Sequence, residues 1–414
     1  MVTPSSTRLL SFADARQIVK RRAATLSPTE PELTGLLDAV GLVLAEDVLA
    51  DRDFPPFPRA TRDGFAVRAA DVQSVPARLL RVGEIKAGAT VEASGISVGP
   101  GEAVEIMTGA PVPVGADAVV MVECTASANA RVTVQRAVKA GENVVPAGAE
   151  ARRGDVMVPK GTRVQHAAVA VAAAVGRPEI AVFRRPRVAV LATGDELVDV
   201  NLPPGPNEIR NSNSYSLAAQ VYEAGGEAVI LPVARDDAAD LALLLRKGLE
   251  ADLLLLSGGV SAGKYDLVEE VLASLGAKFF FTGVAIQPGK PVVFGEVALN
   301  GKTTPFFGLP GNPVSTMVTF QLFVRPVLDA LAGAKLEPLP FTQAILKAPL
   351  RTKIGLTRFL PAKLDGAHDK PGVELVQWQG SGDLMAASTA NCYIVVPPDR
   401  EQFEAGETVT VLLF

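Results

Sequence analysis

Three segments of the chain place glycine together with carboxyl or hydroxyl residues directly after an apolar stretch. They are TGDEL (193–197), SGGVSAGKYD (257–266) and GLPGNPVS (308–315). Glycine allows backbone N–H groups to approach an oxyanion, and carboxylates are ligands for a hard divalent cation. If the three segments lie at one edge of a sheet, they form a site for an anionic ligand and a metal ion.

The elements expected around these segments provide such an edge. Between Arg187 and Leu331, apolar runs that predict strands alternate with stretches that predict helices. The alternation continues through PVVFGEV and TPFFGLPG and is typical of βαβ units around a parallel sheet that is covered on both faces. Ligands of such sheets bind outside the carboxyl ends of the strands, so the three segments should meet at one rim.

Each segment taken alone also has an ordinary structural explanation. TGDEL could be a turn with a solvated acidic pair, SGGVSAG a glycine-rich helix start, and GLPGNPVS a proline-stiffened one. Three such coincidences at one sheet edge favour a ligand site instead. A Walker A pattern is absent, and no G-x-G-x-x-G follows RVAVLAT, so a P-loop NTPase and a Rossmann dehydrogenase find no support.

Composition limits both the metal and the partners. The 414 residues include two His and two Cys, too few for a zinc knot, an iron–sulfur cluster or a disulfide framework, which leaves a hard metal on carboxylates. With His166 in an alanine-rich stretch, a Ser-His-Asp triad lacks its base. Cys124 and Cys392 could form one disulfide, but two cysteines in so long a chain favour free thiols in a reducing compartment.

Charge and hydropathy predict a soluble, cytoplasmic protein. The chain has 40 basic and 45 acidic residues, and this formal charge of −5 predicts no general attraction to nucleic acid or to an anionic membrane. The N-terminal residues lack the apolar run of a secretory signal. Elsewhere the apolar runs are shorter than the roughly 18 residues that span a bilayer.

The regions outside 187–331 predict further domains, since a length of 414 residues corresponds to about three. Ser11 and Asp14 have capping-box spacing ahead of a helix over 12–24. A second helix, with Leu33, Leu36, Leu37 and Val40 on one face, is expected to follow Pro31 and to end at Gly41.

Short β-branched runs between glycine and proline residues predict an all-β domain from Asp51 to about Val145. A hairpin at 151–164 and a helix at 165–175 are expected after it. Beyond Pro338 five short apolar runs predict a compact, barrel-like β-domain.

Two proline-rich segments of the first β-domain carry polar residues on turns. DFPPFPRATRDGFAV (53–67) exposes Asp63 on a glycine turn, and EIMTGAPVPVGADAVVMVE (105–123) places Thr108 and Gly109 between two proline-stiffened segments. Rigid surface loops would explain both segments if they stood alone.

As an ordered set, these motifs resemble those of the molybdopterin molybdenumtransferase family, which makes molybdenum cofactor and includes the E-domain of gephyrin. The resemblance extends from about residue 10 to the C-terminus. The matching blocks are DFPPF with DGFAV, MTGAP, TGDEL, SGGVSAGKYD, PGKP (288–291), GLPGNPVS and SGDLMAASTANCYIVVPP (381–398).

The resemblance implies a multidomain subunit of α/β and β parts. The four parts are a discontinuous linker domain (1–50 and 145–177), an inserted β-domain (51–144), a three-layer α/β molybdopterin-binding domain (178–333) and a C-terminal β-barrel (334–414). It also implies an elongated homodimer, whose active cleft lies between the α/β domain of one subunit and the β-domain of the other.

The implied reaction takes adenylylated molybdopterin and molybdate, uses Mg2+ to hydrolyse the adenylyl group, releases AMP and leaves molybdenum on the pterin sulfurs. A molybdopterin adenylyltransferase and apo-molybdoenzymes are the expected further partners, with no nucleic acid and no membrane. Two other functions stay open: adenylylation of molybdopterin with ATP, because the α/β domain is shared with adenylyltransferases, and a non-catalytic scaffold like gephyrin.

Residue roles follow from the matching motifs. The resemblance implies catalytic roles for Asp266, Glu196, Asp63 and Thr108. The metal ligands that it implies are Glu196, Asp236 and Asp266. The expected substrate-binding residues are Ser257, Gly258, Gly259, Ser261, Lys290, Pro310, Gly311, Asn312, Pro313 and Ser381.

Three positions depart from the pattern of many relatives. Arg62 replaces a methionine, Glu150 takes over an acidic role from a neighbouring position, and Gln287 replaces a basic residue. These departures leave the expected reaction class unchanged.

Overall fold

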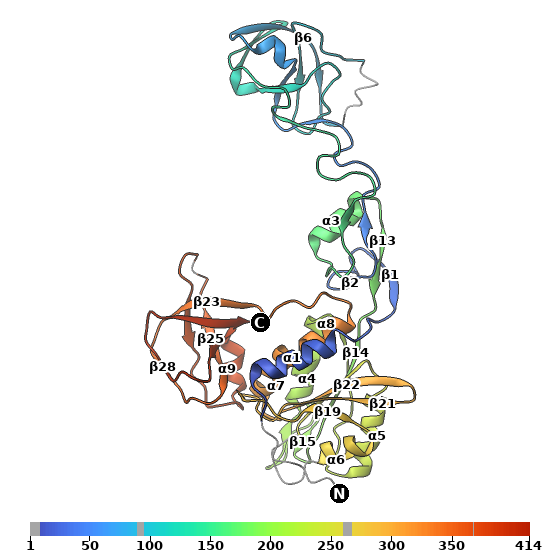
Figure 1. Ribbon diagram of the computed structural model, residues 1–414, viewed down its shortest axis with the longest axis vertical. Helices are drawn as coiled ribbons and strands as arrows, with labels where there is room; N and C mark the ends of the chain where they lie inside the picture. Colours follow the sequence, from blue (N-terminus) through green and yellow to red (C-terminus); the bar gives the residue numbers. More distant parts are fainter. Residues whose placement is uncertain (1–8, 89–94, 260–266, 367) are drawn as a thin grey trace.

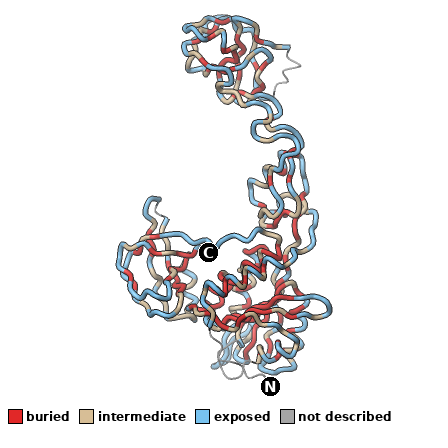
Figure 2. Tube along the Cα trace, viewed as in Figure 1, coloured by how far each residue is buried: buried red, intermediate tan, exposed pale blue. Residues whose placement is uncertain are grey.

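The computed structural model describes residues 9–88, 95–259, 267–366 and 368–414. The molecule is elongated (Figure 1): the α/β domain and the C-terminal barrel lie side by side at one end, and the inserted β-domain forms the other end. The small linker domain lies between them. Each part has its own buried core, whereas the two chain crossings into the β-domain are largely exposed (Figure 2).

The α/β domain contains a six-stranded sheet. Its strands, in spatial order, are β17 (Glu227–Ile230), β14 (Arg187–Ala192), β18 (Leu253–Ser257), β22 (Lys302–Leu309), β21 (Val293–Leu299) and β19 (Lys278–Phe281). The first four are parallel to one another, as the alternation of strands and helices predicts.

Strand β21 is antiparallel to both of its neighbours, so the prediction of a wholly parallel sheet is wrong at this point. β21 and β22 form a hairpin whose turn contains Asn300 and Gly301, both at positive φ. An Asn-Gly pair favours such a two-residue turn, and the turn sends the chain directly back beside β21.

Helices cover both faces of this sheet. One layer contains α5 (Ala238–Gly248) and α6 (Leu267–Ser274), and the other contains α4 (Ser212–Glu223), α7 (Pro313–Thr319) and α8 (Arg325–Leu331). A π-helical turn (Phe320–Val324) joins α7 to α8. Within the described residues, the run Pro313–Leu331 is long and apolar enough to cross a membrane, but 72% of its apolar window is buried inside the protein, as in a core helix.

The first helix, α1 (Phe12–Ala23), confirms the helix expected over 12–24, and the Ser11 side chain accepts a hydrogen bond from the Asp14 N–H. α1 packs against α8 in the α/β domain rather than in the linker domain. The buried Arg16 of α1 donates to the Leu322 carbonyl of the π-helical turn, and burial lowers the pKa of Arg16 to about 10.

The second helix expected near the N-terminus is absent from the described residues. Residues Pro31–Gly35 form strand β1, which pairs with β13 (Glu179–Phe183), and a turn follows to Gly41. Leu33 and Leu37 are 70% and 81% exposed, so the helical spacing of the leucines does not mark a buried face. The backbone of this segment is satisfied by a partner strand about 150 residues away, which local periodicity does not encode.

The linker domain is built from paired segments of both chain crossings. β13 also pairs with β2 (Val43–Leu44), so the linker sheet extends to Phe183, beyond the boundary expected at residue 177. The expected hairpin at 151–164 is wrong, because β12 (Val156–Val158) pairs with β3 (Val48–Leu49) from the N-terminal segment. Helix α3 (His166–Ala174) confirms the helix expected at 165–175.

The β-domain contains one six-stranded sheet, which confirms the all-β prediction. Its strands, in spatial order, are β8 (Ala118–Met121), β5 (Gly64–Val67), β7 (Glu102–Ile106), β6 (Ala77–Ile85), β10 (Arg131–Val134) and β9 (Thr125–Ala128). At the neck toward the linker domain, β4 (Arg59–Ala60) pairs with β11 (Val144–Val145), and Arg59 forms an ion pair with Glu150 at 2.7 Å.

The C-terminal region is a closed five-stranded barrel, as predicted. Its strands, in order around the barrel, are β25 (Thr357–Leu364), β26 (Gly372–Leu375), β23 (Phe341–Leu346), β29 (Thr408–Leu413) and β27 (Cys392–Val396), which pairs with β25. The short strand β20 (Ile286–Gln287) of the α/β domain adds to β25. A short helix that the sequence reasoning missed, α9 (Leu384–Thr389), precedes β27. Cys124 and Cys392 are both free, which excludes the disulfide.

The junction between the linker sheet and α8 generates a stability prediction. Gly333 and Gly276 have the same place after α8 and α6, with φ of 76° and 81°. A Cβ at Gly333 would lie 2.2 Å from the Phe183 ring, whereas a Cβ at Gly276 would meet nothing within 4 Å. Gly276→Ala should therefore cost about 1 kcal/mol of unfolding free energy, from the left-handed conformation alone, and Gly333→Ala at least about 1 kcal/mol more.

Denaturant unfolding of both variants beside the unsubstituted protein measures this difference. Equal losses in the two variants would show that the Phe183 ring moves aside at no cost.

Candidate functional site

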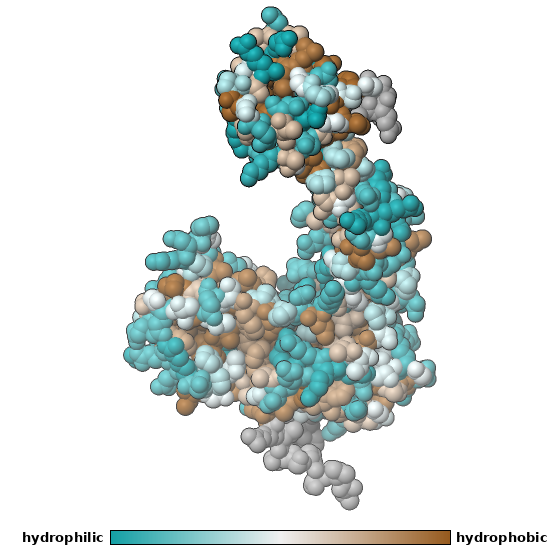
Figure 3. Space-filling view, turned by 45° about the horizontal axis from the view of Figure 1, so that its top comes forward, coloured by the Kyte–Doolittle hydropathy of each residue, from teal (hydrophilic) through white to brown (hydrophobic). Residues whose placement is uncertain are grey.

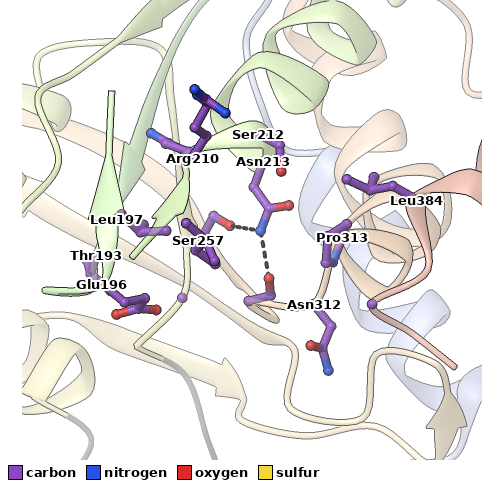
Figure 4. Close-up of a pocket in the computed structure, with 15 residues that line it drawn as sticks. Thr193, Glu196, Leu197, Arg210, Ser212, Asn213, Ser257, Asn312, Pro313 and Leu384 are labelled. Atoms are coloured by element: carbon purple, nitrogen blue, oxygen red, sulfur yellow. Dashed lines mark hydrogen bonds between the residues drawn. The ribbon is translucent and has the colours of Figure 1, made fainter. Parts of the chain in front are cut away.

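A cleft of about 500 Å3 opens at the carboxyl ends of β14, β18 and β22 (Figure 4). The structure thus brings TGDEL, GLPGNPVS and the described start of SGGVSAGKYD together, as the sheet topology predicts. The residues of these segments that line the cleft are Thr193, Glu196, Leu197, Ser257, Gly258, Gly311, Asn312 and Pro313. Residues 209–213, before and within the start of α4, and Gly382 and Leu384 of the barrel complete the lining.

The loops after β14 and β18 lie in direct contact, and this contact requires glycine. Gly258 and Gly259 have φ of 90° and 67°. A Cβ at Gly258 would lie 2.7 Å from the Thr193 carbonyl oxygen, and a Cβ at Gly259 would lie 2.6 Å from Thr193 Oγ1. The two glycines therefore allow the tight turn and the close approach of the two loops. Gly258 also leaves the backbone accessible at the cleft.

Two hydroxyl groups lie at the ends of the neighbouring strands β14 and β18. Thr193 is 5% exposed and Ser257 is 2% exposed, and both line the cleft. Within the described part of the chain, Thr193 Oγ1 is buried and has no hydrogen-bond partner. A buried hydroxyl without a partner is costly, so a ligand oxygen at this position would satisfy it.

The start of α4 also contributes to the cleft, and the sequence reasoning missed it. Asn211 caps the helix by accepting from the Ser214 N–H at 3.2 Å. Asn213 Nδ2 donates to Ser257 Oγ at 3.0 Å and to the Gly311 carbonyl at 2.7 Å (Figure 4). The run Asn-Ser-Asn-Ser at 211–214 could have indicated this helix start, because such residues favour the first positions of helices.

Carboxylates gather beside the cleft. Glu196 lines it, and the Asp236 N–H donates to Asp195 Oδ1 at 3.3 Å. Desolvation first, and then the negative charges of Asp195 and Glu196, raise the pKa of Asp236 above its ordinary value. A cation would relieve this repulsion.

The structure describes only two of the three metal ligands expected from the sequence. Ser261 and Asp266 lie outside the described residues. In the ranges that are described, no group of three or more His, Cys, Asp or Glu side chains has the arrangement of a metal site. The metal ligands Glu196, Asp236 and Asp266 therefore stay a prediction.

A second cavity, of about 380 Å3, lies between the α/β domain and the barrel. Lys290, Pro310, Ser381 and Trp378 line it, and Asn312 lines both this cavity and the cleft. The Val314 N–H donates to the Ser381 carbonyl at 3.0 Å, which holds the barrel loop at the start of α7. Eight of the ten predicted substrate-binding residues thus line one or both of two neighbouring cavities, whereas Gly259 lines neither and Ser261 lies outside the described residues.

Asp63 and Thr108 contact each other in the β-domain, which is separated from the α/β domain by the linker domain (Figure 1). Thr108 donates to Asp63 Oδ1 through its backbone N–H at 2.6 Å and through its hydroxyl at 2.7 Å. These two bonds lower the pKa of the exposed Asp63 carboxyl below its ordinary value. Within one chain the pair does not reach the cleft.

The Asp63–Thr108 contact generates a prediction about protonation. Thr108→Val removes the hydroxyl donor and keeps the backbone donor, so the pKa of Asp63 should rise toward its ordinary value without reaching it. Carboxyl-carbon NMR titration measures this pKa. Thr133→Val, on β10 of the same domain, should leave it unchanged, and an unchanged pKa in Thr108→Val would contradict the role of the hydroxyl.

Comparison with known protein families assigns the whole architecture. Residues 10–176 match the MoeA N-terminal region (domains I and II), residues 189–330 match a probable molybdopterin-binding domain, and residues 343–414 match the MoeA C-terminal region (domain IV). These matches cover the linker and β-domains, the α/β domain with its cleft, and the barrel.

Similar proteins cover nearly the full length. The molybdopterin molybdenumtransferase of Nostoc sp. is 38% identical over 98% of this chain and 94% of its own length, and that of Bacillus subtilis is 34% identical over 93% and 90%. The crystal structure of the molybdopterin biosynthesis MoeA protein of Pyrococcus horikoshii OT3 aligns with a TM-score of 0.79 at 28% identity, over 98% of this chain and all of that one. The chain therefore belongs to the molybdopterin molybdenumtransferase family, the transferases of molybdenum cofactor biosynthesis.

Proposed function

We propose that this transferase inserts molybdenum from molybdate into adenylylated molybdopterin and releases AMP in a Mg2+-dependent reaction, in the cytoplasm. The observation that carries the proposal is the cleft itself. Backbone around Gly258 and Gly311, two buried hydroxyls and the start of α4 face one space beside a group of carboxylates. Donors for an oxyanion next to ligands for a hard cation suit a phosphoryl group and its metal ion.

The pyrophosphate linkage of the substrate is assigned to the loops at 257–259 and 311–313. The N–H groups at the start of a helix favour negative charge, and α4 begins at this cleft. Thr193 and Ser257 supply hydroxyl groups that are already positioned by neighbouring strands. The apolar lining from Leu197, Ile209 and Leu384 suits the ring portions of the substrate.

Glu196 and Asp236, with Asp266 assigned by its motif, would hold the Mg2+. Their oxygen donors are the ligands that this ion prefers. Desolvation, followed by the negative charges of Asp195 and Glu196, raises the pKa of Asp236, and a bound cation would offset both effects. When bound, the ion would neutralise charge on the phosphate oxygens. The carboxylates of this chain orient the ion, and the glycine loops exclude side chains from the space that the phosphates need.

Molybdate is assigned to the second cavity. Lys290 contributes a positive charge there, and the Ser381 loop lies opposite the start of α7. Because Asn312 lines both cavities, an anion in the second cavity is next to the cleft that holds the pterin. Because the two cavities adjoin, molybdenum could pass from molybdate in the second cavity to the pterin in the cleft.

The position of Asp63 and Thr108 supports a homodimer. The β-domain, which contains the pair, and the α/β domain, which contains the cleft, lie at opposite ends of one chain, so the pair and the cleft can act together only if they come from different subunits (Figure 1). The surface is deeply hollowed between the barrel and the β-domain (Figure 3), which leaves room for a second copy. A symmetric pair of chains would then build two equivalent clefts.

The reaction is tested by turnover. Purified protein, incubated with adenylylated molybdopterin, molybdate and Mg2+, should release AMP in an amount equal to the cofactor formed. Removal of Mg2+ with a chelator should stop the release, because the phosphate charge is then uncompensated. Absence of AMP together with turnover of ATP and free molybdopterin would establish the adenylyltransferase function in its place.

The shared cleft is tested by mixing inactive variants. Asp63→Asn and Glu196→Gln should each abolish cofactor formation, whereas a mixture that exchanges subunits should regain about a quarter of the activity, since about half of the dimers then have one cleft with both faces intact. Restored activity also requires a concentration at which dimers form, which light scattering measures. No recovery in a mixture proven to contain heterodimers would place Asp63 and Glu196 in one chain's site.

A further inference from the structure

We infer that Asn213 is a positioning residue that sets the hydrogen-bond polarity of the cleft, so that Ser257 presents a donor to a deprotonated phosphoryl oxygen. The inference deepens the proposed function and rests on it. It concerns a side chain that reaches the cleft from α4, outside the motifs that assign the other binding residues.

The orientation of the Asn213 amide is determined by its neighbour. A carbonyl oxygen only accepts hydrogen bonds, so the atom 2.7 Å from the Gly311 carbonyl is the amide nitrogen. The same nitrogen lies 3.0 Å from Ser257 Oγ. Its two hydrogens therefore bind one acceptor each, on two different loops (Figure 4).

The consequence for Ser257 is a fixed polarity. Its oxygen accepts from Asn213, so its own proton must point elsewhere. No other described group of the protein accepts that proton, and Ser257 is 2% exposed at the wall of the cleft. The missing acceptor is best supplied by a ligand oxygen.

Thr193 points to the same kind of ligand. It follows Ala192, which pairs with Ser257 across the parallel strands, and its Oγ1 lacks a partner in the described structure. Two hydroxyls with unused donor capacity thus lie at the ends of adjacent strands.

The Gly311 carbonyl completes this arrangement. Asn213 engages it, so one acceptor of the cleft wall is already used by the protein. With a carbonyl occupied and two hydroxyls available, the wall favours ligands that only accept. A phosphate monoester or a pyrophosphate linkage without a proton is such a ligand, and its charged oxygens accept stronger hydrogen bonds than a neutral acceptor does.

A purely structural role for Asn213 would be to tie α4 to two loops. The two roles differ in how Asn213 and Ser257 depend on each other. If Asn213 acts through Ser257, removal of the Ser257 hydroxyl matters only while Asn213 can donate to it. If Asn213 only holds α4 against the two loops, the effects of the two substitutions on ligand binding are additive.

The test is a double-mutant cycle with AMP as the probe, measured by calorimetry on the full chain. In Asn213→Asp the carboxylate accepts, so the Ser257 proton turns toward it and leaves the ligand. Ser257→Ala should weaken AMP binding about tenfold in the unsubstituted protein and less than about twofold in the Asn213→Asp background. Repulsion of AMP by the new charge is present in both halves of that comparison and cancels.

Two further variants keep the test decisive. Asn391→Asp makes the same change to an amide that donates to the Leu364 carbonyl of the barrel, and it should leave AMP binding unchanged. Asn213→Ala removes both bonds without a new charge and replaces Asn213→Asp in the cycle if thermal unfolding shows that the latter does not fold. A smaller coupling of the same sign is then expected, because the Ser257 proton is released but not captured.

The outcomes separate this inference from the proposed function. Equal losses from Ser257→Ala in both backgrounds, or normal AMP binding by Asn213→Asp, would overturn the role of Asn213 while AMP release by turnover stands. If the unsubstituted protein does not bind AMP, the cleft does not present donors to a phosphoryl group and the inference fails. The turnover experiment alone then decides the proposed function.

Discussion

The parallel register of β14, β18 and β22 is the constraint on which the cleft depends. Ala192 pairs with Ser257, and Ser257 pairs with Leu309, so the three strands end at the same level. Each following loop therefore begins at the same rim, and residues more than 100 positions apart become neighbours. The helices on both faces hold this register, because a shift of one strand would disrupt the close packing of its buried side chains against them.

The close approach of the loops follows from that register. Since Thr193 lies directly against Gly258 and Gly259, the chain can pass there only without a Cβ. Where these two loops meet, backbone and hydroxyl groups form the wall of the cleft. Asn213 then joins two of the loops from the helix side, so that the cleft is bounded by α4 as well as by the sheet.

The elongated shape has a different physical origin. The β-domain is an insertion whose two crossings pair with each other, through β4 and β11 and the Arg59–Glu150 ion pair. At the other end, the Arg163 guanidinium of the linker region binds the Asp329 carboxylate of α8 at 2.8 Å. The linker domain is thus bound to the α/β domain at its base, and it separates the β-domain, which contains Asp63 and Thr108, from the α/β domain of the same chain.

The α/β pattern, the all-β insertion, the barrel, the first helix and the segments at the cleft could all be predicted from the amino-acid sequence. These features have local signals: periodic apolar residues, capping residues and glycine after a strand. The strand at 31–35, the pairing of β12 with β3, and the hydrogen bonds from Asn213 to Ser257 and Gly311 could be seen only in the folded chain. In each of these cases the partner lies far away in the sequence, and hydrogen bonds to a distant segment outweigh the local preference that periodicity reports.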